Sequence, residues 1–422
     1  MFENIIGQES TLTALRSELA QGSFPRSVLF FGPAYSGKLS TALEAARVLT
    51  CREGKADWAC ECSSCRSQKE LLHPYTLLLG SRYWDVEIAS AADSLLRNEK
   101  PPTQYLFLRA VRKLTRRFDP AIWEAEDSRM RAAQEKVASI EEMLLDVTPG
   151  RELGPKKQLA STLESIITAC VQLASLARGE TISIGQVRKL SSWAHVTAGG
   201  SRKVAILENA ERMQESARNA LLKLLEEPPA GVHLILLSTR RAAIIPTVLS
   251  RLRPYPFEQR PREQEAAVLT RIFRSEGGQF ESLRAFFLAW KEINPERLSA
   301  LSRRFMEAVL DPGGNGGDIL GELAELLPSE RRGGRDRGQK EAVISFLEEL
   351  TFRFQDLLRG AAVPRDVLEG WGAGVREGMM RVDAYNMHPA TVVEALFLKM
   401  RDAVRRDSEE TGAPSAGAGA PR

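Results

Sequence analysis

Residues 27–40 read SVLFFGPAYSGKLS. The first five residues form a short apolar run that is typical of a buried parallel strand. The next residues approach the phosphate-binding loop G-x-x-x-x-G-K-[ST], with Gly32, Gly37 and Lys38 in place. Residues 40–50 then have the pattern of a helix. The order of strand, loop and helix predicts an α/β domain built around a phosphate loop.

The loop departs from the full pattern at Leu39, where a serine or threonine is expected. A hydroxyl at that position ligates Mg²⁺, which leucine cannot do. Ser40 follows one residue later and is rotated by about 100° around the helix axis, so it is a poor substitute. Backbone N–H groups and Lys38 would still suit a phosphate. The loop alone therefore leaves two alternatives open, a nucleotide site and a glycine-rich turn without a ligand.

The α/β pattern continues later in the chain and is then replaced by helices. Residues 203–207 and 232–237 read as buried strands, each alternating with a predicted helix. This alternation predicts a parallel sheet covered by helices on both faces. Beyond residue 258 the strand signals end and helical stretches dominate, up to a small, polar tail at 408–422 that is predicted to be disordered.

Length and composition place the chain among soluble proteins of two or three domains. Its 422 residues exceed one ordinary domain, and its 58 basic and 55 acidic residues give a net charge of +3. That balance does not favour a protein that coats nucleic acid. No apolar run of membrane-spanning length and no export signal is apparent, so we expect a cytoplasmic protein without a membrane segment.

Four of the five cysteines, Cys51, Cys60, Cys62 and Cys65, fall close together after the helix predicted at residues 40–50. Four thiolates at this density predict a closed, structural Zn²⁺ site. The alternative is four reduced thiols without a metal. The fifth cysteine, Cys170, lies on an apolar helical stretch and is expected to pack in the core.

The segment KVAILENAER (203–212) also bears on whether the chain is able to hydrolyse ATP. Its strand ends in Glu208, which is able to assist a metal, but Asn209 follows and has no carboxylate to act as a general base. Leu39 and Asn209 each lack a group that hydrolysis needs. The two departures together predict that ATP turnover is absent or very slow.

Residues 105–118 form an amphipathic helix with a basic stripe, defined by Arg109, Arg112, Lys113, Arg116 and Arg117. Such a stripe is able to contact nucleic-acid phosphates. The alternative is a solvated helix face.

Several ordered motifs together resemble one family, the bacterial DNA polymerase III clamp-loader subunits, which are AAA+ proteins. The motifs are FENIIGQE, the cysteine cluster followed by HP, GQVRKL, KVAILENAERM, ARNALLKLLEEPP and IIPTVLSR. They cover roughly residues 1–80 and 182–260. Leu39 and the Glu208-Asn209 pair favour the non-hydrolysing delta-prime subunit over gamma/tau. The family usually has two residues between its second and third cysteines, whereas this chain has one.

The resemblance implies a domain order. An AAA+ α/β domain would span 1–257, with a zinc knuckle at 51–65 and a helical insertion at about 81–178. A helical lid at 258–310 and a helical collar domain at 311–407 would follow, and then the tail at 408–422.

The resemblance also implies site residues. Arg251 of the Ser250–Arg251 pair would act as an arginine finger in a neighbouring subunit's nucleotide site. Thr239 would lie where the family has its first nucleotide sensor, and Arg297 near the second. Gly32, Gly37, Lys38 and Glu208 would form a degenerate nucleotide site in which ATP binding stays open. Cys51, Cys60, Cys62 and Cys65 would hold zinc.

The function implied is that of a stator subunit in a hetero-pentamer with gamma/tau and delta. That complex loads the sliding clamp at primer–template DNA with ATP. Two alternatives remain: a gamma/tau-like ATPase that uses Lys38 and Glu208, and a DNA-binding protein that acts through the basic stripe of the insertion.

Overall fold

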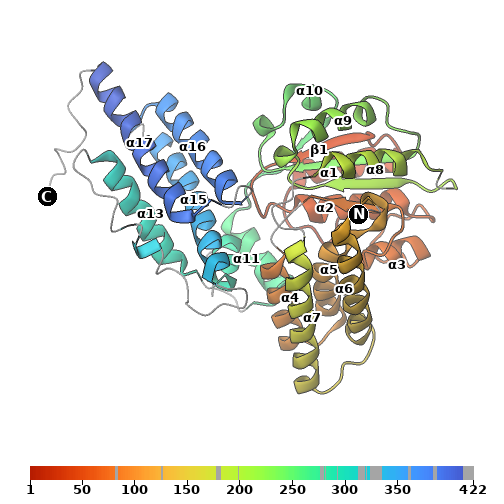
Figure 1. Cartoon of the computed structure of the whole chain (residues 1–422). Helices are drawn as coiled ribbons and strands as arrows, with labels where there is room; N and C mark the ends of the chain where they lie inside the picture. The colour runs from red at the N-terminus through yellow and green to blue at the C-terminus, as the bar shows by residue number, and fades with distance from the viewer. Residues whose placement is uncertain are drawn as a thin grey trace. The chain divides into compact units, whose positions relative to one another are not determined.

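The computed structural model describes residues 1–80, 84–124, 127–176, 182–197, 199–275, 280, 282–291, 293–311, 319, 321–323, 335–359, 363–383 and 387–411. The chain divides into two compact units, Met1–Phe287 and Leu288–Arg422 (Figure 1). Each unit has its own hydrophobic core within these described residues.

The N-terminal unit is built on a five-stranded sheet in the order β2-β3-β4-β1-β5. All four neighbouring pairs are parallel, and Leu29 of β1, for example, lies opposite Leu236 of β4. Because the strands run parallel, their carboxyl ends gather at one edge, where ligand sites form in such folds. The strands are β1 (Ser27–Phe31), β2 (Thr76–Leu79), β3 (Lys203–Leu207), β4 (Val232–Ser238) and β5 (Arg253–Pro256).

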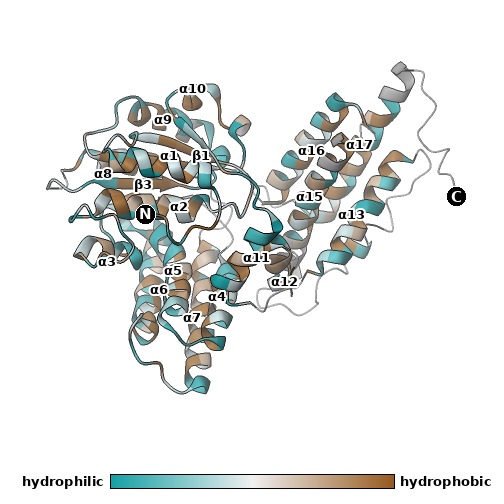
Figure 2. Ribbon diagram, turned by 180° about the vertical axis from the view of Figure 1, so that it is seen from behind, coloured by the Kyte–Doolittle hydropathy of each residue, from teal (hydrophilic) through white to brown (hydrophobic). Residues whose placement is uncertain are grey.

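Alternate residues of the central strands enter two different cores, as the two-residue period of a strand requires. Val28 and Phe30 of β1 pack with α1 (Glu9–Ala20) and α2 (Lys38–Thr50) on one face. Leu29 packs on the other face, with α8 (Ile184–His195) and α9 (Glu215–Glu226) among its neighbours. The sheet is therefore buried on both sides, which explains its nearly continuous apolar strands, drawn in brown for β3 in Figure 2.

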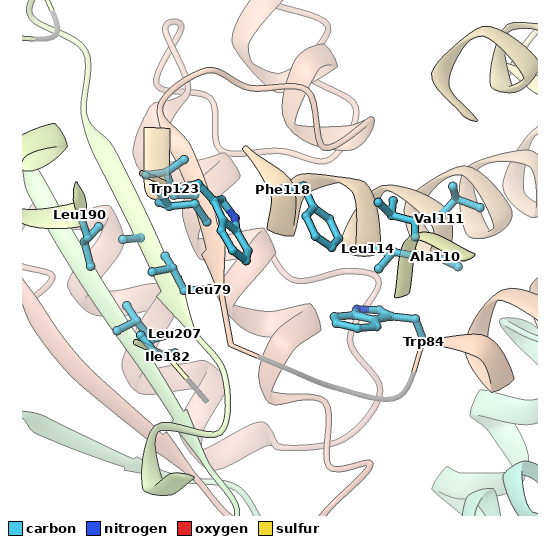
Figure 3. Close-up of a cluster of buried hydrophobic side chains, with 14 of the residues drawn as sticks. Leu79, Trp84, Ala110, Val111, Leu114, Phe118, Trp123, Ile182, Leu190 and Leu207 are labelled. Carbon is cyan, nitrogen blue, oxygen red and sulfur yellow. The ribbon is translucent and has the colours of Figure 1, made fainter. Parts of the chain in front are cut away.

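Four helices of the insertion extend the second core. Phe118 and Trp123 stack with ring centroids 5.7 Å apart and lie beside Leu79 of β2 (Figure 3). The insertion is therefore anchored on the sheet by buried aromatic rings. Its helices are α4 (Asp85–Arg97), α5 (Pro101–Thr115), α6 (Ser128–Leu144) and α7 (Lys156–Leu176), with short 3-10 turns η1 (Arg116–Phe118), η2 (Pro120–Ile122) and η3 (Leu145–Val147).

Helix α7 is the one helix among the described residues that is long and apolar enough to cross a membrane. Its residues Leu159, Leu163, Ile166, Cys170 and Leu173 are buried in the core of the N-terminal unit. These five positions follow a regular helical spacing, so one face of α7 packs against protein. A single such helix is weak evidence for a membrane span. The predicted core position of Cys170 is confirmed.

Short elements complete the N-terminal unit. They are α3 (Ser63–Lys69), η4 (Ala210–Arg212), η5 (Arg241–Ala243), α10 (Pro246–Leu249) and α11 (Arg262–Arg271), and α12 (Leu283–Trp290) spans the boundary between the units.

The C-terminal unit is helical and differs from the expected boundaries. Its core joins α13 (Pro295–Leu310) to α15 (Arg335–Arg359), α16 (Arg365–Asp383) and α17 (Pro389–Thr411). The boundary falls after Phe287, earlier than the expected 310, because the apolar face of α13 packs in this core. Helix α17 also continues through Thr411, so the disorder expected from residue 408 is wrong for its first four residues. Residues 412–422 lie outside the described residues.

Candidate phosphate loop, cysteine cluster and arginine site

The glycines of the loop are required by close backbone approaches. Gly32 has φ of +149°, and a Cβ there would lie 2.0 Å from the carbonyl oxygen of Phe257. Gly37 has φ of +96°, and a Cβ there would lie 2.4 Å from the guanidinium of Arg260. Both contacts are shorter than any side chain tolerates, so the two glycines keep the strand–loop–helix shape whether or not a ligand binds.

Lys38 is directed at the loop itself. Its Nζ donates to the carbonyl oxygens of Gly32 and Pro33, both at 2.6 Å, and lies 3.2 Å from the hydroxyl of Ser36. An ammonium group has three protons, so these contacts use its full donor capacity. Burial lowers the pKa of Lys38 to about 8, although Glu211 and Glu208 act to raise it. Leu39 is buried in the adjacent core and points no polar group at the loop.

Arg260 contacts the phosphate loop and the N-terminal segment, and no sequence pattern had indicated this role. The side chain is buried, its Nε donates to the carbonyl oxygen of Ile6 at 3.0 Å, and its Nη1 donates to the carbonyl oxygen of Tyr35. The ring of Tyr35 stacks on Phe287 with centroids 5.0 Å apart. Arg260 thus joins the N-terminal segment to the loop from a position more than 200 residues away, where no local pattern reveals a partner.

Glu208, at the end of β3, is buried and paired with Arg117 of the insertion. Arg117 also donates to the carbonyl oxygen of Leu79, and the indole of Trp123 donates to the carbonyl oxygen of Arg117 at 2.7 Å. A guanidinium therefore stands against the carboxylate that was expected to face a metal. Arg117 was expected on a basic stripe, and its pairing with Glu208 was not predicted.

Thr239 follows β4 and is held by Glu211. The Oε1 atom of Glu211 accepts from the backbone N–H of Thr239 at 3.1 Å and from its hydroxyl at 2.7 Å. The structure therefore brings Lys38, Glu208 and Thr239 to the carboxyl edge of the sheet, but all three polar groups have partners inside the protein.

The four clustered cysteines converge despite their unusual spacing. All four Sγ atoms lie within 4.8 Å of one another, and those of Cys51 and Cys60 are 3.8 Å apart. Sulfurs around a tetrahedral Zn²⁺ with bonds of 2.3 Å would be about 3.8 Å apart. Burial acts to raise the pKa of Cys62, but backbone N–H groups of Cys65 and Arg52 outweigh it and lower that pKa to about 6. The donor set therefore fits a structural metal ion of the zinc type.

A buried arginine, Arg47 of α2, supports this cluster. Its Nη1 donates to the Sγ of Cys65 at 3.3 Å and to the carbonyl oxygen of Asp57 at 2.9 Å. Its Nη2 donates to the carbonyl oxygen of Ala56 at 2.8 Å, and it forms an ion pair with Glu44 at 2.7 Å. Arg47 thus links the cysteine loop to the helix that follows the phosphate loop.

The basic stripe of α5 faces protein, so the expectations of a phosphate surface and of a solvated face are both wrong. Arg109 donates to the carbonyl oxygen of Lys69 at 2.8 Å, and Arg112 to that of Glu70 at 3.0 Å. Both acceptors lie at the C-terminal end of α3, where helix carbonyls lack partners. Lys113 pairs with Glu87, and Arg116 with Asp119 at 3.0 Å. The stripe therefore attaches the insertion to the cysteine region, and the DNA-binding alternative loses its basis.

Arg251 lies just after α10, at the surface of the N-terminal unit. Its Nε donates to Oε1 of Glu226 at 2.9 Å, and Nη2 donates to the same oxygen. Its Nη1 donates to the carbonyl oxygen of Thr247 at 2.7 Å. The side chain keeps 32% of its surface exposed. Arg297, by contrast, lies on α13 of the C-terminal unit.

Comparisons with known proteins agree with the resemblance expected from the motifs. The family model described as DNA polymerase III, delta subunit, matches residues 7–90 and 156–261. The unmatched stretch between them lies inside the segment expected as an insertion.

Individual relatives match parts of the chain. DNA polymerase III subunit delta' of Pseudomonas aeruginosa is 46% identical over 71 residues, covering 17% of this chain and 22% of that protein. DNA polymerase III subunit gamma/tau of Mycobacterium tuberculosis is 34% identical over 123 residues, covering 26% of this chain and 21% of that protein. A DNA polymerase III gamma subunit-related protein from Thermotoga maritima, solved by crystallography, covers 56% of this chain and 90% of that chain at 19% identity, with a TM-score of 0.26.

The chain thus spans about a fifth of the length of these curated relatives. The resemblance to bacterial DNA polymerase III clamp-loader subunits is confirmed, and the first of these relatives is a delta' subunit.

Proposed function

We propose, from this resemblance to DNA polymerase III clamp-loader subunits, that the chain is a delta-prime-like subunit of such a loader. In this proposal it does not hydrolyse ATP and offers Arg251 to the nucleotide site of an adjacent subunit. The observation that carries the proposal is the state of its own site. Lys38 is bonded to the loop carbonyls and Glu208 is paired with Arg117, so both charged groups are engaged within the chain.

The chemistry of the site supports the absence of turnover. Hydrolysis of ATP needs a Mg²⁺ ion held by a hydroxyl and a carboxylate, and a group that orients water. Leu39 is buried in the core, and a guanidinium stands against the carboxylate of Glu208. Asn209 has no carboxylate. The guanidinium of Arg251 is also engaged within the chain, but its pair with Glu226 lies at the surface, with side chains 32% and 48% exposed, so a second molecule is able to compete for it. Arginine suits phosphate recognition by its paired N–H donors.

The wider role follows the resemblance and belongs to the same proposal. The partners would be the gamma/tau and delta subunits of a hetero-pentamer, which loads the sliding clamp at primer–template DNA in the cytoplasm. The C-terminal helical unit would serve as the collar that joins the subunits. The four cysteines would hold a structural Zn²⁺ ion, which supplies folding stability and takes no part in the reaction.

A gamma/tau-like ATPase is the second candidate, because a gamma/tau relative matches 123 residues of the chain. It predicts that the isolated chain turns over ATP and that Lys38→Ala abolishes this turnover. The delta-prime-like proposal predicts no turnover by the isolated chain.

The decisive experiment measures DNA-stimulated ATPase and clamp loading in a complex reconstituted with the partner subunits. Arg251→Ala is expected to reduce both by about ten-fold or more, as loss of an arginine finger does. The matched control is Arg253→Ala, two residues later and also exposed, which is expected to leave both rates unchanged. Equal rates for wild type and Arg251→Ala would refute the proposal.

A further inference from the structure

All three guanidinium nitrogens of Arg251 donate to acceptors inside its own chain. Glu226 accepts from two of its nitrogens, and the third faces the carbonyl oxygen of Thr247 and, at 3.1 Å, the hydroxyl of Ser250. An arginine in this arrangement has to leave Glu226 before it is able to bind a phosphate on another subunit. The pair therefore bears directly on the function proposed above.

We propose that Glu226 is a positioning residue that holds Arg251 in a parked conformation until a neighbouring subunit presents a nucleoside triphosphate. This inference rests on the proposed function. Release of Arg251 is then an exchange of one anion for another: the carboxylate of Glu226 is replaced by the phosphate oxygens of the bound nucleotide. The chain would supply its finger only when the neighbour's site is filled.

The ion pair of Arg251 with Glu226 has the geometry of a weak contact that is able to dissociate. Nε and Nη2 both reach the same oxygen, Oε1 of Glu226, so the pair is not the two-oxygen fork that makes arginine–carboxylate contacts strong. The side chains are 32% and 48% exposed, so water and salt screen the attraction. A triphosphate offers several oxygens and a higher charge, and it therefore competes well for the same guanidinium.

The position of Glu226 also explains why Arg251 rests against it. Glu226 is the last residue of α9, where the helix carries its partial negative charge. A carboxylate is unfavourable at that end of a helix unless a cation faces it. Arg251 supplies that cation from just after α10, through its ion pair with Glu226.

The test uses Glu226→Gln in the reconstituted complex, because glutamine keeps the shape and removes the charge. The matched control is Glu227→Gln, the neighbouring exposed glutamate, which makes the same charge change one residue further on. ATPase rates are measured without DNA across a range of ATP concentrations and with saturating ATP plus primer–template DNA.

Glu226→Gln is expected to raise the rate at low ATP by about 1.5- to 5-fold, the range that an exposed ion pair corresponds to. The saturated rate should stay the same, so the effect appears in KM and not in kcat. Glu227→Gln should match wild type throughout. A variant that only disturbed the fold would lower kcat. A melting curve of the isolated chain would also reveal its loss of stability.

The outcomes separate this inference from the function on which it rests. If Arg251→Ala slows the complex but Glu226→Gln leaves the KM for ATP unchanged or raises it, parking by Glu226 is wrong and the trans-acting role of Arg251 stands. If Arg251→Ala has no effect, both proposals fail.

Discussion

Arg117 of the insertion forms a buried ion pair with Glu208, which lies 91 residues later at the end of β3. The exposed fractions of the two side chains are 4% and 11%. The insertion thus supplies a cation to the acidic residue at the end of β3 that was expected to assist a metal. The insertion therefore contributes a buried side chain to the carboxyl edge of the sheet.

The first prediction concerns this pair. Arg117→Met should lower the free energy of unfolding by about 3–5 kcal/mol, because it leaves a buried carboxylate without its partner. The double variant Arg117→Met/Glu208→Met should recover much of that loss, because it buries no charge. Denaturant unfolding followed by tryptophan fluorescence measures both.

A matched control lies in the same insertion. Arg129 pairs with Asp127 at 2.6 Å and keeps 42% of its side chain exposed. Arg129→Met should cost less than about 1 kcal/mol. Equal losses for Arg117→Met and Arg129→Met would contradict the buried role of Arg117.

The second prediction concerns pH and Lys38. Its pKa is about 8 in the folded chain, against 10.5 as the ordinary value. Below pH 8 both states hold the proton and the cost of burying the charge is fully present. Between pH 8 and 10.5 the folded chain has released the proton and the unfolded chain has not, so stability rises with pH. Wild type should therefore gain stability relative to Lys38→Met across this window, by at most about 1.4 kcal/mol per pH unit.

Unfolding of both proteins at several pH values between 7 and 10.5 measures this difference. Arg26→Met, at an exposed position, serves as a control that should show no change across the same window. A constant difference between wild type and Lys38→Met would mean that Lys38 titrates as an ordinary lysine.

The third prediction concerns metal content. The purified chain should contain about one Zn²⁺ ion, measured by elemental analysis, and a strong chelator should lower its melting temperature. Cys62→Ser should lose the ion, because one of the four thiolates is removed. Cys170→Ala should keep it, because Cys170 is buried on α7 outside the cluster. Metal retained by Cys62→Ser would rule out a four-thiolate site.

The fourth prediction separates Arg47 from the ligands themselves. Arg47→Met should weaken zinc binding by about 10- to 100-fold, as loss of a group that hydrogen-bonds a metal ligand does. Competition with a chromogenic chelator measures the affinity. Arg66→Met is the control, because Arg66 is exposed on α3 and donates to the carbonyl oxygen of Glu61, which is not a cysteine. Equal zinc affinities for the two variants would argue against support by Arg47.

Two elements escaped the sequence analysis for local reasons. Strand β5 reads RPYP, and prolines are poor strand residues except at an edge, which is where β5 lies. Helix α16 contains Gly370, Gly372, Gly374 and Gly378, which weaken helical propensity. Tertiary packing overrides that weakness, since Trp371 and Val375 of α16 are buried in the C-terminal core.

The features whose evidence is local were predictable from the amino-acid sequence alone. The apolar strand before Gly32, the spacing from Gly32 to Lys38 and the density of cysteines all act over a few residues, so the α/β fold and the thiol cluster followed from them. The loss of a hydroxyl at Leu39 and of a carboxylate at Asn209 was equally visible.

The partners of the charged side chains became visible only in the folded structure. Arg117 and Arg112 belong to one basic stripe in the sequence, yet one faces Glu208 and the other the end of α3. Lys38 faces its own loop, and Arg251 faces Glu226. The sequence of a charged helix face is the same whether that face is exposed to water or packed against protein. The partners of its charged side chains come from segments far away in the chain. The fold was therefore predictable from the periodicity of neighbouring residues. The partners of the charged site residues depend on contacts between residues far apart in the chain.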